Sequence, residues 1–556
     1  MINRRTAVLI PWLAVLLAQV SYATEYYASP AGSGTECSSK SPCKIASFWI
    51  KAKPGDVLNL RDGTYTGDDS MINPPADGAD GRVCRSRFGG SEGKPITVRA
   101  INDGRAIIDG QWRRLPGRLS CTQYLVLEGM RFQNSSGTVV ETRMSTRNVY
   151  RRISAYNGNY YLLPNRTLCP NARYYNYHVF TLIYDSTYNI VEDSIFGGSG
   201  RDLMNSFGKS NFNIFRRNIL VGGGYVRANE IPGCAVPDRE SHGEASQLYG
   251  VSDNVVENVI AFGIGNWQNR AHPKQAGLNI WANTNQEAHR NKYYGTLVMD
   301  YPEYGFYHAS VCNGYDNSIN SAMCVSEAYY ENVVSFRNGI NFLARNGSNH
   351  IIRNATFLQG GLGVGSSNSI QAGIYTDEKW GIGGNSSWLY ENILIGDNQG
   401  HGCYGVSTLS PQNVTFNHAL FYGNKSDFFG KCASVNQNNI TQEVNPKLTS
   451  LIYVDATSPA HKAGKNGDQV GADMRCRYVS RFANGTIITE RTSLSLWPLP
   501  DFINERAKAE TLEIHGTAYD VNAKVLDALG PRDKGKLACP GETSAPPARP
   551  TELTVR

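Results

Sequence analysis

Short runs of alternating apolar and polar residues recur along most of the chain, and many of them close on an acid or arginine followed by asparagine. Examples are Val256-Glu257-Asn258, Tyr330-Glu331-Asn332 and Tyr390-Glu391-Asn392. Seven such runs end at positions 193, 218, 258, 332, 354, 392 and 417, which lie 25, 40, 74, 22, 38 and 25 residues apart. A base period of 22–25 residues with longer gaps predicts a solenoid whose rungs carry insertions.

The period of two within each run indicates strands rather than helices. Each rung is too short for a four-stranded propeller blade, and no leucine pattern indicates a horseshoe repeat. We therefore predict an all-β fold, a right-handed parallel β-helix over residues 24–475. In this fold the Val, Ile and Phe positions face the bore. The repeated Asn residues stack at one bend of each rung and are structural, not catalytic.

The ends of a solenoid must be capped because they expose apolar faces. Ser41-Pro42 predicts the start of a short N-terminal helix, with Ser as the cap and Pro in the first turn. Its apolar face would be Ile45, Phe48, Trp49 and Ile50. At the other end, the coil is expected to run out near Gly471-Ala472-Asp473. Residues 476–539 form an appendage that looks helical over 500–530, and the Pro-rich residues 540–556 form a flexible tail.

Residues 1–23 have the pattern of a secretory signal peptide. Arg4 and Arg5 precede an apolar run from Ala7 to Val20, and small residues follow. The run is too short for a confident membrane span, and no later segment has the ~18 apolar residues that one needs. We expect a secreted or periplasmic protein without a membrane span.

All 12 cysteines follow this segment, and an even number in an exported chain predicts up to six disulfides. The pairing stays open, although the local pairs Cys37–Cys43, Cys312–Cys324 and Cys403–Cys432 are compatible with the spacing. No Cys or His spacing indicates a structural zinc site.

The net charge and the composition limit the classes of partner that this protein can bind. The 556 residues carry 54 Lys and Arg against 48 Asp and Glu, a net charge of +6, and loss of the signal peptide with its two arginines leaves +4. This suits an anionic partner but is far from a nucleic-acid-binding footprint. With 41% hydrophobic and 18% charged residues, the chain is not globally disordered.

Three passages resemble the pectin-lyase-like β-helix superfamily of secreted polysaccharide-acting proteins. They are the entry residues 26–34 with 53–56 and 62–65, the asparagine-bend rungs, and the closing residues 458–464 with 470–473. The resemblance covers about residues 24–475 and implies the β-helix fold. It leaves the activity open, since the superfamily includes lyases, hydrolases, epimerases, esterases and non-enzymatic proteins.

Residues 201–211 resemble the chondroitinase-B-like and alginate-lyase branch, in which an acidic calcium ligand lies a few residues before a Lys-Ser step. Asp202 and Lys209 have a similar spacing. In that branch the cation neutralises the uronate carboxylate and acidifies the neighbouring C–H, and the lysine removes the proton. The chain departs from the pattern, because it has one acid there. It also has Tyr249-Gly250 where an Arg-His-Gly-like step is expected.

Long gaps between rungs indicate loops that line a groove, at residues 222–247, 263–288, 296–328 and 361–388. Their acids, bases and aromatics suit an acidic sugar chain. The candidate catalytic residues are Lys209, His242 and Arg270; the candidate substrate-binding residues are Arg239, His272, Lys274, Tyr301, Tyr304, Tyr307 and His308; and the candidate calcium ligands are Asp202, Glu240 and Glu244.

The favoured function is that of a monomeric, secreted polysaccharide lyase that cleaves an acidic polysaccharide by calcium-assisted β-elimination. A glycoside hydrolase on the same fold is the first alternative. Gly400-His401-Gly402 is similar to a hydrolase step whose partner motifs are missing, so His401 is interpreted as structural. Inverting hydrolysis needs two carboxylates, and Asp185 with Asp202 is the pair that we can propose. A non-catalytic carbohydrate-binding or surface protein is the second alternative.

Overall fold

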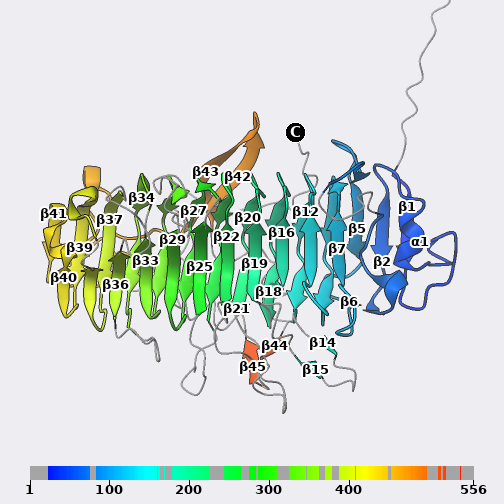
Figure 1. The fold of residues 1–556 in the computed structure, drawn as a ribbon, viewed down its shortest axis with the longest axis horizontal. Coiled ribbons are helices and arrows are strands. Elements are labelled where there is room, and N and C mark those ends of the chain that lie inside the picture. The colour runs from blue at the N-terminus through cyan, green and yellow to red at the C-terminus, as the bar shows by residue number, and fades with distance from the viewer. Residues whose placement is uncertain are drawn as a thin grey trace, which may run out of the picture.

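The computed structural model describes residues 23–75, 83–158, 161–162, 168–169, 178–198, 201–223, 243–263, 275–282, 286–310, 325–345, 347–361, 370–377, 387–406, 409–448, 453–496, 511–514, 517–520 and 539. Most of these residues form one elongated coil in which short parallel strands stack rung on rung (Figure 1). The sequence repeat of 22–25 residues is the length of one rung without insertions. For example, Ile190 pairs with Ile214, one rung and 24 residues later. The predicted parallel β-helix is confirmed.

Two parallel sheets run along the coil in the described part of the chain. One sheet has 11 strands in the spatial order β40 (Ser426–Gly430), β38 (His401–Gly405), β36 (Ala372–Asp377), β33 (Ile340–Arg345), β29 (Tyr304–Ser310), β25 (Gln275–Ala282), β22 (Gly243–Tyr249), β19 (Asp202–Phe207), β16 (Phe180–Ile183), β11 (Val140–Arg143) and β7 (Gly117–Ser120). Every neighbouring pair of strands in this sheet is parallel. The connection between two parallel strands of one sheet is almost always right-handed, so the coil is a right-handed β-helix.

The other sheet has 24 strands stacked in two ladders, which form the remaining sides of each rung. They are β1 (Glu25–Ala28), β2 (Val57–Leu60), β3 (Gly63–Tyr65), β5 (Ile96–Ala100), β6 (Ala106–Asp109), β9 (Leu125–Glu128), β10 (Arg131–Gln133), β12 (Val149–Arg151), β13 (Ser154–Tyr156), β17 (Ile190–Glu192), β18 (Ile195–Gly198), β20 (Ile214–Arg216), β21 (Ile219–Gly222), β23 (Val255–Glu257), β24 (Ile260–Phe262), β27 (Lys292–Tyr294), β28 (Leu297–Met299), β31 (Tyr329–Glu331), β32 (Val334–Phe336), β34 (His350–Arg353), β35 (Thr356–Leu358), β37 (Trp388–Gly396), β39 (Val414–Tyr422) and β41 (Asn436–Gln442).

Short elements complete the described structure. The strand pairs are β4 (Phe88–Gly89) with β8 (Thr122–Gln123), β14 (Tyr161–Leu162) with β15 (Leu168–Cys169), β26 (Ala288–His289) with β30 (Val325–Ser326), β42 (Cys476–Ala483) with β43 (Thr486–Ser495), and β44 (Thr511–Ile514) with β45 (Thr517–Asp520). One α-helix, α1 (Ile45–Trp49), and short 3-10 turns at Asp68–Ser70, Pro411–Asn413, Lys431–Ser434 and Lys465–Gly467 account for the helical residues described.

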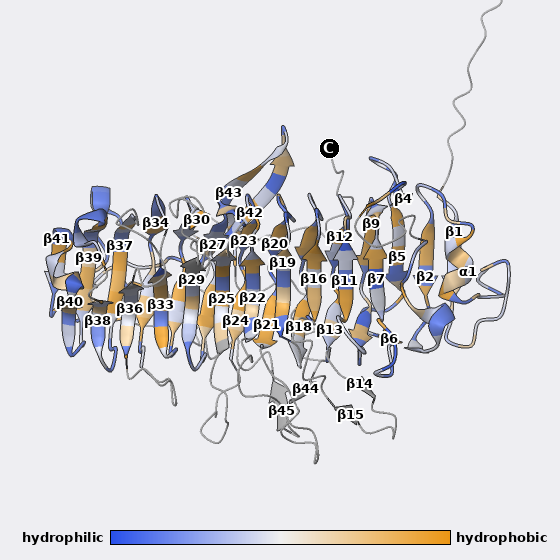
Figure 2. Cartoon of the chain, in the orientation of Figure 1, coloured by the Kyte–Doolittle hydropathy of each residue, from blue (hydrophilic) through white to orange (hydrophobic). Residues whose placement is uncertain are grey.

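Buried side chains at paired positions of successive strands stack along the axis of the bore. Phe215, Val256, Tyr293 and Tyr330 are paired in successive strands and are all fully or almost fully buried. The rings of Tyr293 and Tyr330 stack with their centroids 5.1 Å apart, because parallel in-register strands place equivalent side chains one above the other. Figure 2 shows the resulting apolar character of the strands along the whole coil.

An asparagine ladder stabilises one bend, but its members differ from those expected. The backbone N–H of Asn189 donates to Asn213 Oδ1 (2.9 Å), and that of Asn213 donates to Asn254 Oδ1 (2.8 Å). Asn258 and Asn332, two of the expected members, instead sit at another corner with φ of 54° and 52°. Asn tolerates this left-handed conformation well, which explains its recurrence there. The interpretation of the repeated Asn residues as structural is consistent with both positions.

The N-terminal end is closed by α1, whose Phe48 and Trp49 are buried against the first rungs. The helix begins at Ile45, so the prediction of a start at Ser41-Pro42 is wrong. Cys43 is held in an extended conformation because its N–H donates to Tyr27 O, which leaves no room for a helical turn before Lys44. Ile50 is 85% exposed and does not contribute to the apolar face.

Beyond β41 the chain runs back along the outside of the coil as a strap formed by residues 453–496, the C-terminal strap. The N–H of Lys465 donates to Asn392 Oδ1 (2.8 Å), and further along the strap Tyr478 N–H donates to Asn258 Oδ1 (3.1 Å). The parallel ladder thus ends at Gln442, and residues 453–475 lie against earlier rungs instead of adding one (Figure 1).

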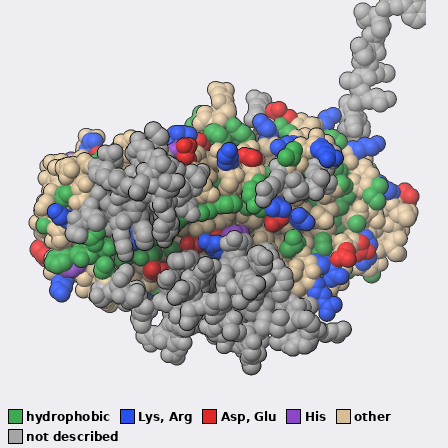
Figure 3. Space-filling view, in the orientation of Figure 1, with side chains coloured by type: hydrophobic (Ala, Val, Ile, Leu, Met, Phe, Trp, Pro, Cys, Tyr) green, Lys and Arg blue, Asp and Glu red, His purple; other side chains and the backbone are tan. Residues whose placement is uncertain are grey.

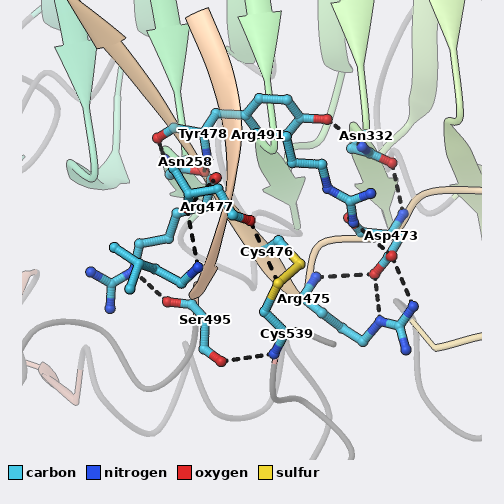
Figure 4. The surroundings of a disulfide bond; sticks show 12 residues. Asn258, Asn332, Asp473, Arg475, Cys476, Arg477, Tyr478, Arg491, Ser495 and Cys539 are labelled. Atoms are coloured by element: carbon cyan, nitrogen blue, oxygen red, sulfur yellow. Dashed lines mark hydrogen bonds and ion pairs between the residues drawn. A yellow bond between two sulfur atoms is a disulfide. The ribbon is translucent and has the colours of Figure 1, made fainter. Parts of the chain in front are cut away.

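Figure 4 shows how the strap is fastened. Asp473 accepts hydrogen bonds from Arg475 and Arg491, each at 2.6 Å, and a disulfide joins Cys476 to Cys539. Burial raises the pKa of the Asp473 carboxyl, but the two guanidinium groups outweigh burial and hold it below its usual value. These bonds hold the strap to itself and to Cys539. The strap is bound to the coil by the ion pair of Lys465 with Glu391 (2.8 Å) and by the N–H of Asp473, which donates to Asn332 Oδ1 (2.8 Å).

The C-terminal appendage consists of β-hairpins where it is described. β42 and β43 pair antiparallel, as do β44 and β45, so the expected helix is wrong for residues 511–514 and 517–520; the rest of 500–530 lies outside the described residues. The period-two pattern of Thr511–Asp520 around His515-Gly516 is a hairpin signal. In β43, Ile487 packs on an outer apolar row that includes Val126 and Ile190.

Four disulfides are described: Cys37–Cys43, Cys84–Cys121, Cys403–Cys432 and Cys476–Cys539. Two of the suggested local pairs are confirmed, and the third, Cys312–Cys324, lies outside the described residues. The expected signal peptide also lies outside them, apart from residue 23. None of the helices in the described part has the length and apolarity that a membrane crossing requires.

Candidate functional site

A bend at the start of the strands in the eleven-stranded sheet brings polar side chains together on its outer face. Leu203 and Met204 are both buried in the bore, so the flanking residues Asp202 and Asn205 both face outward. Asn205 Nδ2 donates to Asp202 Oδ2 (2.9 Å). Side chains three residues apart therefore meet here, which a regular strand does not allow.

The next two strands extend this arrangement. Glu244 is paired with Asp202, and its N–H donates to Asp202 Oδ1 (3.3 Å). Asn205 Nδ2 also donates to Gln247 Oε1 (3.1 Å), and Asn279 Nδ2 donates to Glu244 Oε1 (3.3 Å). The side chains of the five residues are all buried: Asp202, Asn205, Glu244, Gln247 and Asn279.

A histidine from the preceding rung completes the group. His178, just before β16, places Nδ1 2.9 Å from Asp202 Oδ2, and its side chain is 12% exposed. We refer to the six residues as the polar cluster: His178, Asp202, Asn205, Glu244, Gln247 and Asn279. It spans four adjacent strands of the sheet.

The two carboxyls of the polar cluster have opposite protonation preferences. Burial raises the pKa of Asp202, but the charge and hydrogen bond of His178 outweigh it and hold the pKa well below the usual range. Burial also raises the pKa of Glu244, and the negative charge of Asp202 raises it further, well above the usual range. Two buried carboxyls this close do not both ionise readily, so the charge of Asp202 disfavours ionisation of Glu244.

The oxygen atoms of the polar cluster fit a hard cation in part. Glu244 Oε2 and Asn279 Oδ1 are buried and lack a hydrogen-bond partner among the described residues. Together with Asp202 they offer carboxylate and amide oxygens, the ligands that calcium prefers. No three His, Cys, Asp or Glu side chains of the described chain are grouped as metal ligands, so amide oxygens and water would complete the shell.

Asp202 and Glu244, both predicted as calcium ligands, are thus brought together, but Lys209 is not close to them. The six residues of β19 span about 16 Å from Asp202 to Phe207 at ~3.3 Å per residue, and Lys209 lies beyond that end. Its side chain is exposed, and its backbone is left-handed, with φ of 62°. The rings of Phe207 and Tyr249 stack at this end of the sheet, 4.9 Å apart.

The four predicted substrate-binding residues of the third loop divide into two pairs. Tyr304 and Tyr307 lie on the outer face of β29 with their rings stacked 4.9 Å apart. Tyr301 and His308 do not line a groove, and their prediction is wrong. Both are buried in the coil, where Tyr301 donates to Gly222 O (2.8 Å) and His308 faces the bore. Their positions relative to the bend decide which side they face.

Six predicted residues lie outside the described part of the chain: Arg239, Glu240, His242, Arg270, His272 and Lys274. Four members of the polar cluster were missed: His178, Asn205, Gln247 and Asn279. The signal was present, because His178 lies 24 residues before Asp202, which is one rung. Applying the repeat length to the strand with Asp202 would have identified it.

Comparisons with known proteins give likenesses of fold. No protein-family model matches the chain. Pectate lyase L of Dickeya chrysanthemi is 33% identical over 96 residues, which are 17% of this chain and 21% of that protein. The match thus spans about a fifth of the length of this relative.

Three solved structures are similar at low identity. Pectate lyase Pel9A has a TM-score of 0.45 at 15% identity, over 82% of this chain and 96% of that chain. The A-module of the Azotobacter vinelandii mannuronan C-5 epimerase AlgE6 has a TM-score of 0.44 at 11% identity, over 71% of this chain and 92% of that chain. The PL6 family alginate lyase AlyGC has a TM-score of 0.42 at 13% identity, over 81% of this chain and 58% of that chain. These likenesses concern the fold alone, and the parallel β-helix itself is established by the strand pairings described above.

Proposed function

We propose that this protein is a secreted polysaccharide lyase that cleaves a uronic-acid-containing polysaccharide by β-elimination at the polar cluster. The observation that carries the proposal is the buried contact of His178 with Asp202 beside the second carboxyl of Glu244. Buried titratable groups with opposed pKa shifts are typical of catalytic sites. The four disulfides support an oxidising compartment.

Beta-elimination needs a base for the proton beside the uronate carboxylate. In the proposed step the neutral form of the His178 imidazole accepts this proton, the electron pair of the C–H bond forms the double bond, and the glycosidic C–O bond breaks toward the leaving oxygen. That oxygen leaves as a hydroxyl after taking a proton from water. Asp202 orients the ring of His178 and stabilises the imidazolium that forms.

The substrate carboxylate must be neutralised for its neighbouring C–H to become acidic. Calcium held by Asp202, Glu244 and Asn279 would supply this charge. Arg201, the residue before Asp202, adds positive charge that lowers the pKa of both buried carboxyls. Lys209 and the six candidate residues outside the described part remain proposed contributors, with Lys209 as the rival base.

The test is incubation with alginate, polygalacturonate and glycosaminoglycans, with and without calcium. A lyase produces the ultraviolet absorbance of unsaturated uronates. Absence of this signal with every uronate polymer would contradict the proposal. New reducing ends without absorbance would identify a hydrolase, and polymer binding without any product would identify a non-catalytic protein.

A further inference from the structure

The first rungs of the coil carry an excess of positive charge. Residues 83–152 contain thirteen Lys and Arg against five Asp and Glu, a net charge of +8, whereas the whole chain carries +6. Figure 3 shows several Lys and Arg side chains over these N-terminal rungs, at the right of the view. Such a local excess attracts polyanions even when the net charge of the chain is small.

Two of these arginines lie on the outer face of the eleven-stranded sheet. Arg118 on β7 is paired with Glu141 on β11, and Arg143 follows two residues later on the same face. The Nε atoms of Arg118 and Arg143 lie 3.6 Å and 3.5 Å from Glu141 Oε1. Because two guanidinium groups share one carboxylate, a positive charge is left over. The Arg118 side chain is 46% exposed, so it is accessible to a ligand.

Aromatic rings hold the second arginine in place. The guanidinium carbon of Arg143 lies 5.1 Å from the centre of the Tyr184 ring. Tyr184 in turn contacts Phe207 edge-on, with centroids 6.2 Å apart. A guanidinium fixed in this way loses less side-chain freedom when it binds a carboxylate or sulfate group through two parallel N–H donors.

The arginines and the polar cluster belong to one continuous face. β7, β11, β16 and β19 are consecutive neighbours in the sheet. At about 4.8 Å per strand, Arg118 lies about 14 Å along the coil from Asp202. On the other side of the polar cluster Ile340 and Leu343 are buried and pack with Tyr304, whose pKa is raised by burial and is also affected by the charges of Glu303 and Arg345. The exposed guanidinium of Arg118 thus lies on the N-terminal side of the polar cluster.

We propose that Arg118 and Arg143 form an anion-binding subsite that fixes the direction of the polysaccharide along the sheet. The polymer places carboxylate or sulfate groups over β7 and β11. The proposal rests on the proposed function in that both concern the same polymer, but binding can be measured without cleavage. It predicts that the sugars bound over the N-terminal rungs, on one side of the cleaved bond, are anionic.

The test compares the double variant R118Q/R143Q with the wild-type protein and with R481Q. Arg481 is a matched control, because it also pairs with a glutamate, Glu490, at 3.0 Å, but on the C-terminal hairpin. Affinity for polygalacturonate, alginate and dextran sulfate is measured by affinity electrophoresis at low and moderate salt. Equal melting temperatures show that the variants fold.

We expect at least tenfold weaker binding of the double variant, with a smaller salt dependence, and unchanged binding of R481Q. The carboxylate and sulfate polymers distinguish which anion is bound. Wild-type binding by the double variant, or no binding of any polyanion by the wild type, would overturn the subsite. If unsaturated product forms while the double variant binds normally, the subsite fails and the lyase stands. If binding is lost as expected but no product ever forms, the subsite stands and the lyase fails.

Discussion

Asp202 and Glu244 occupy paired positions on neighbouring strands of the eleven-stranded sheet, and the N–H of Glu244 donates to Asp202 Oδ1 at 3.3 Å. The two carboxyls are 42 residues apart in the sequence and share one buried site. Their pKa values are moved in opposite directions, so Asp202 gives up its proton more readily than Glu244 does.

The first prediction concerns stability. A raised pKa means that Glu244 costs the native state nothing below its unfolded pKa of about 4.3 and destabilises it increasingly as pH rises toward the folded pKa. E244Q should therefore match the wild type near pH 4 and be more stable near pH 8. For Asp202 the sign is opposite. Its lowered pKa stabilises the fold above about pH 3.9, so D202N should cost about 1–3 kcal/mol at neutral pH.

Urea unfolding of E244Q, D202N and the wild type at pH 4, 6 and 8 measures both effects. A stability difference between E244Q and the wild type that does not change between pH 4 and pH 8 would show that Glu244 does not titrate as inferred.

The second prediction concerns calcium. Binding to the native state alone stabilises it, by about 2.7 kcal/mol at a calcium concentration 100 times the Kd. Calcium should raise the Tm of the wild type, and a chelator should reverse the shift. E244Q and N279A should abolish it, because Glu244 Oε2 and Asn279 Oδ1 are the unpartnered oxygens of the polar cluster. Magnesium is the control cation. An equal calcium shift in both variants would place the cation elsewhere.

The third prediction separates the two candidate bases. If His178 removes the proton, H178Q should lower kcat by a factor of about 10²–10⁴, the usual contribution of general base catalysis. K209Q should change kcat less than tenfold, because Lys209 lies beyond the far end of β19. Rates are followed by absorbance of the unsaturated product. The reverse ranking would assign the base to Lys209.

The fourth prediction concerns acid stability. His308 is buried in the bore, with Nδ1 3.0 Å from the Tyr330 hydroxyl and its ring 4.3 Å from that of His350. Burial, and then the charge of His350, lower the pKa of His308 well below its usual value. The native state keeps the ring neutral, while the unfolded chain takes up a proton below pH 6.5. Each pH unit below 6.5 should therefore cost up to about 1.4 kcal/mol.

Removing the buried imidazole tests this sensitivity. Between pH 7 and pH 5 the Tm of H308Q should fall less than that of the wild type, even if H308Q is less stable at pH 7. H418Q is the control, because His418 is only partly buried and contacts Asn417. Parallel Tm curves for H308Q and the wild type would contradict the prediction.

The fifth prediction compares two disulfides. Cys476–Cys539 joins residues 63 positions apart, and Cys37–Cys43 joins residues 6 apart. Loop entropy predicts that replacing the first pair by serines costs about 4 kcal/mol and replacing the second about 2 kcal/mol. Differential scanning calorimetry of the two double variants measures the order. Amide exchange should show that the C-terminal strap opens first in C476S/C539S. Equal losses would mean that the noncovalent contacts of the strap suffice.

The repeat in the sequence determined the coil. Alternation of period two and the rung length of 22–25 residues predict parallel stacked strands, and the bore residues follow from the same pattern, as Tyr293 and Tyr330 show. The spacing made the pairs Cys37–Cys43 and Cys403–Cys432 plausible, and the tertiary structure decided that they form.

The tertiary structure alone decided which outer side chains meet. Neighbours on the sheet face are 24 to 42 residues apart, as His178, Asp202 and Glu244 are, and their register depends on insertion lengths and on the bend after Asp202. A one-residue change there moves a side chain between bore and surface, which is why Tyr301 and His308 were misplaced. The return of the C-terminal strap over earlier rungs was hidden for the same reason, since its contacts with Asn258 span 220 residues. The local sequence pattern determines the length and strands of a rung. Only the packing of distant rungs determines which side chains face each other.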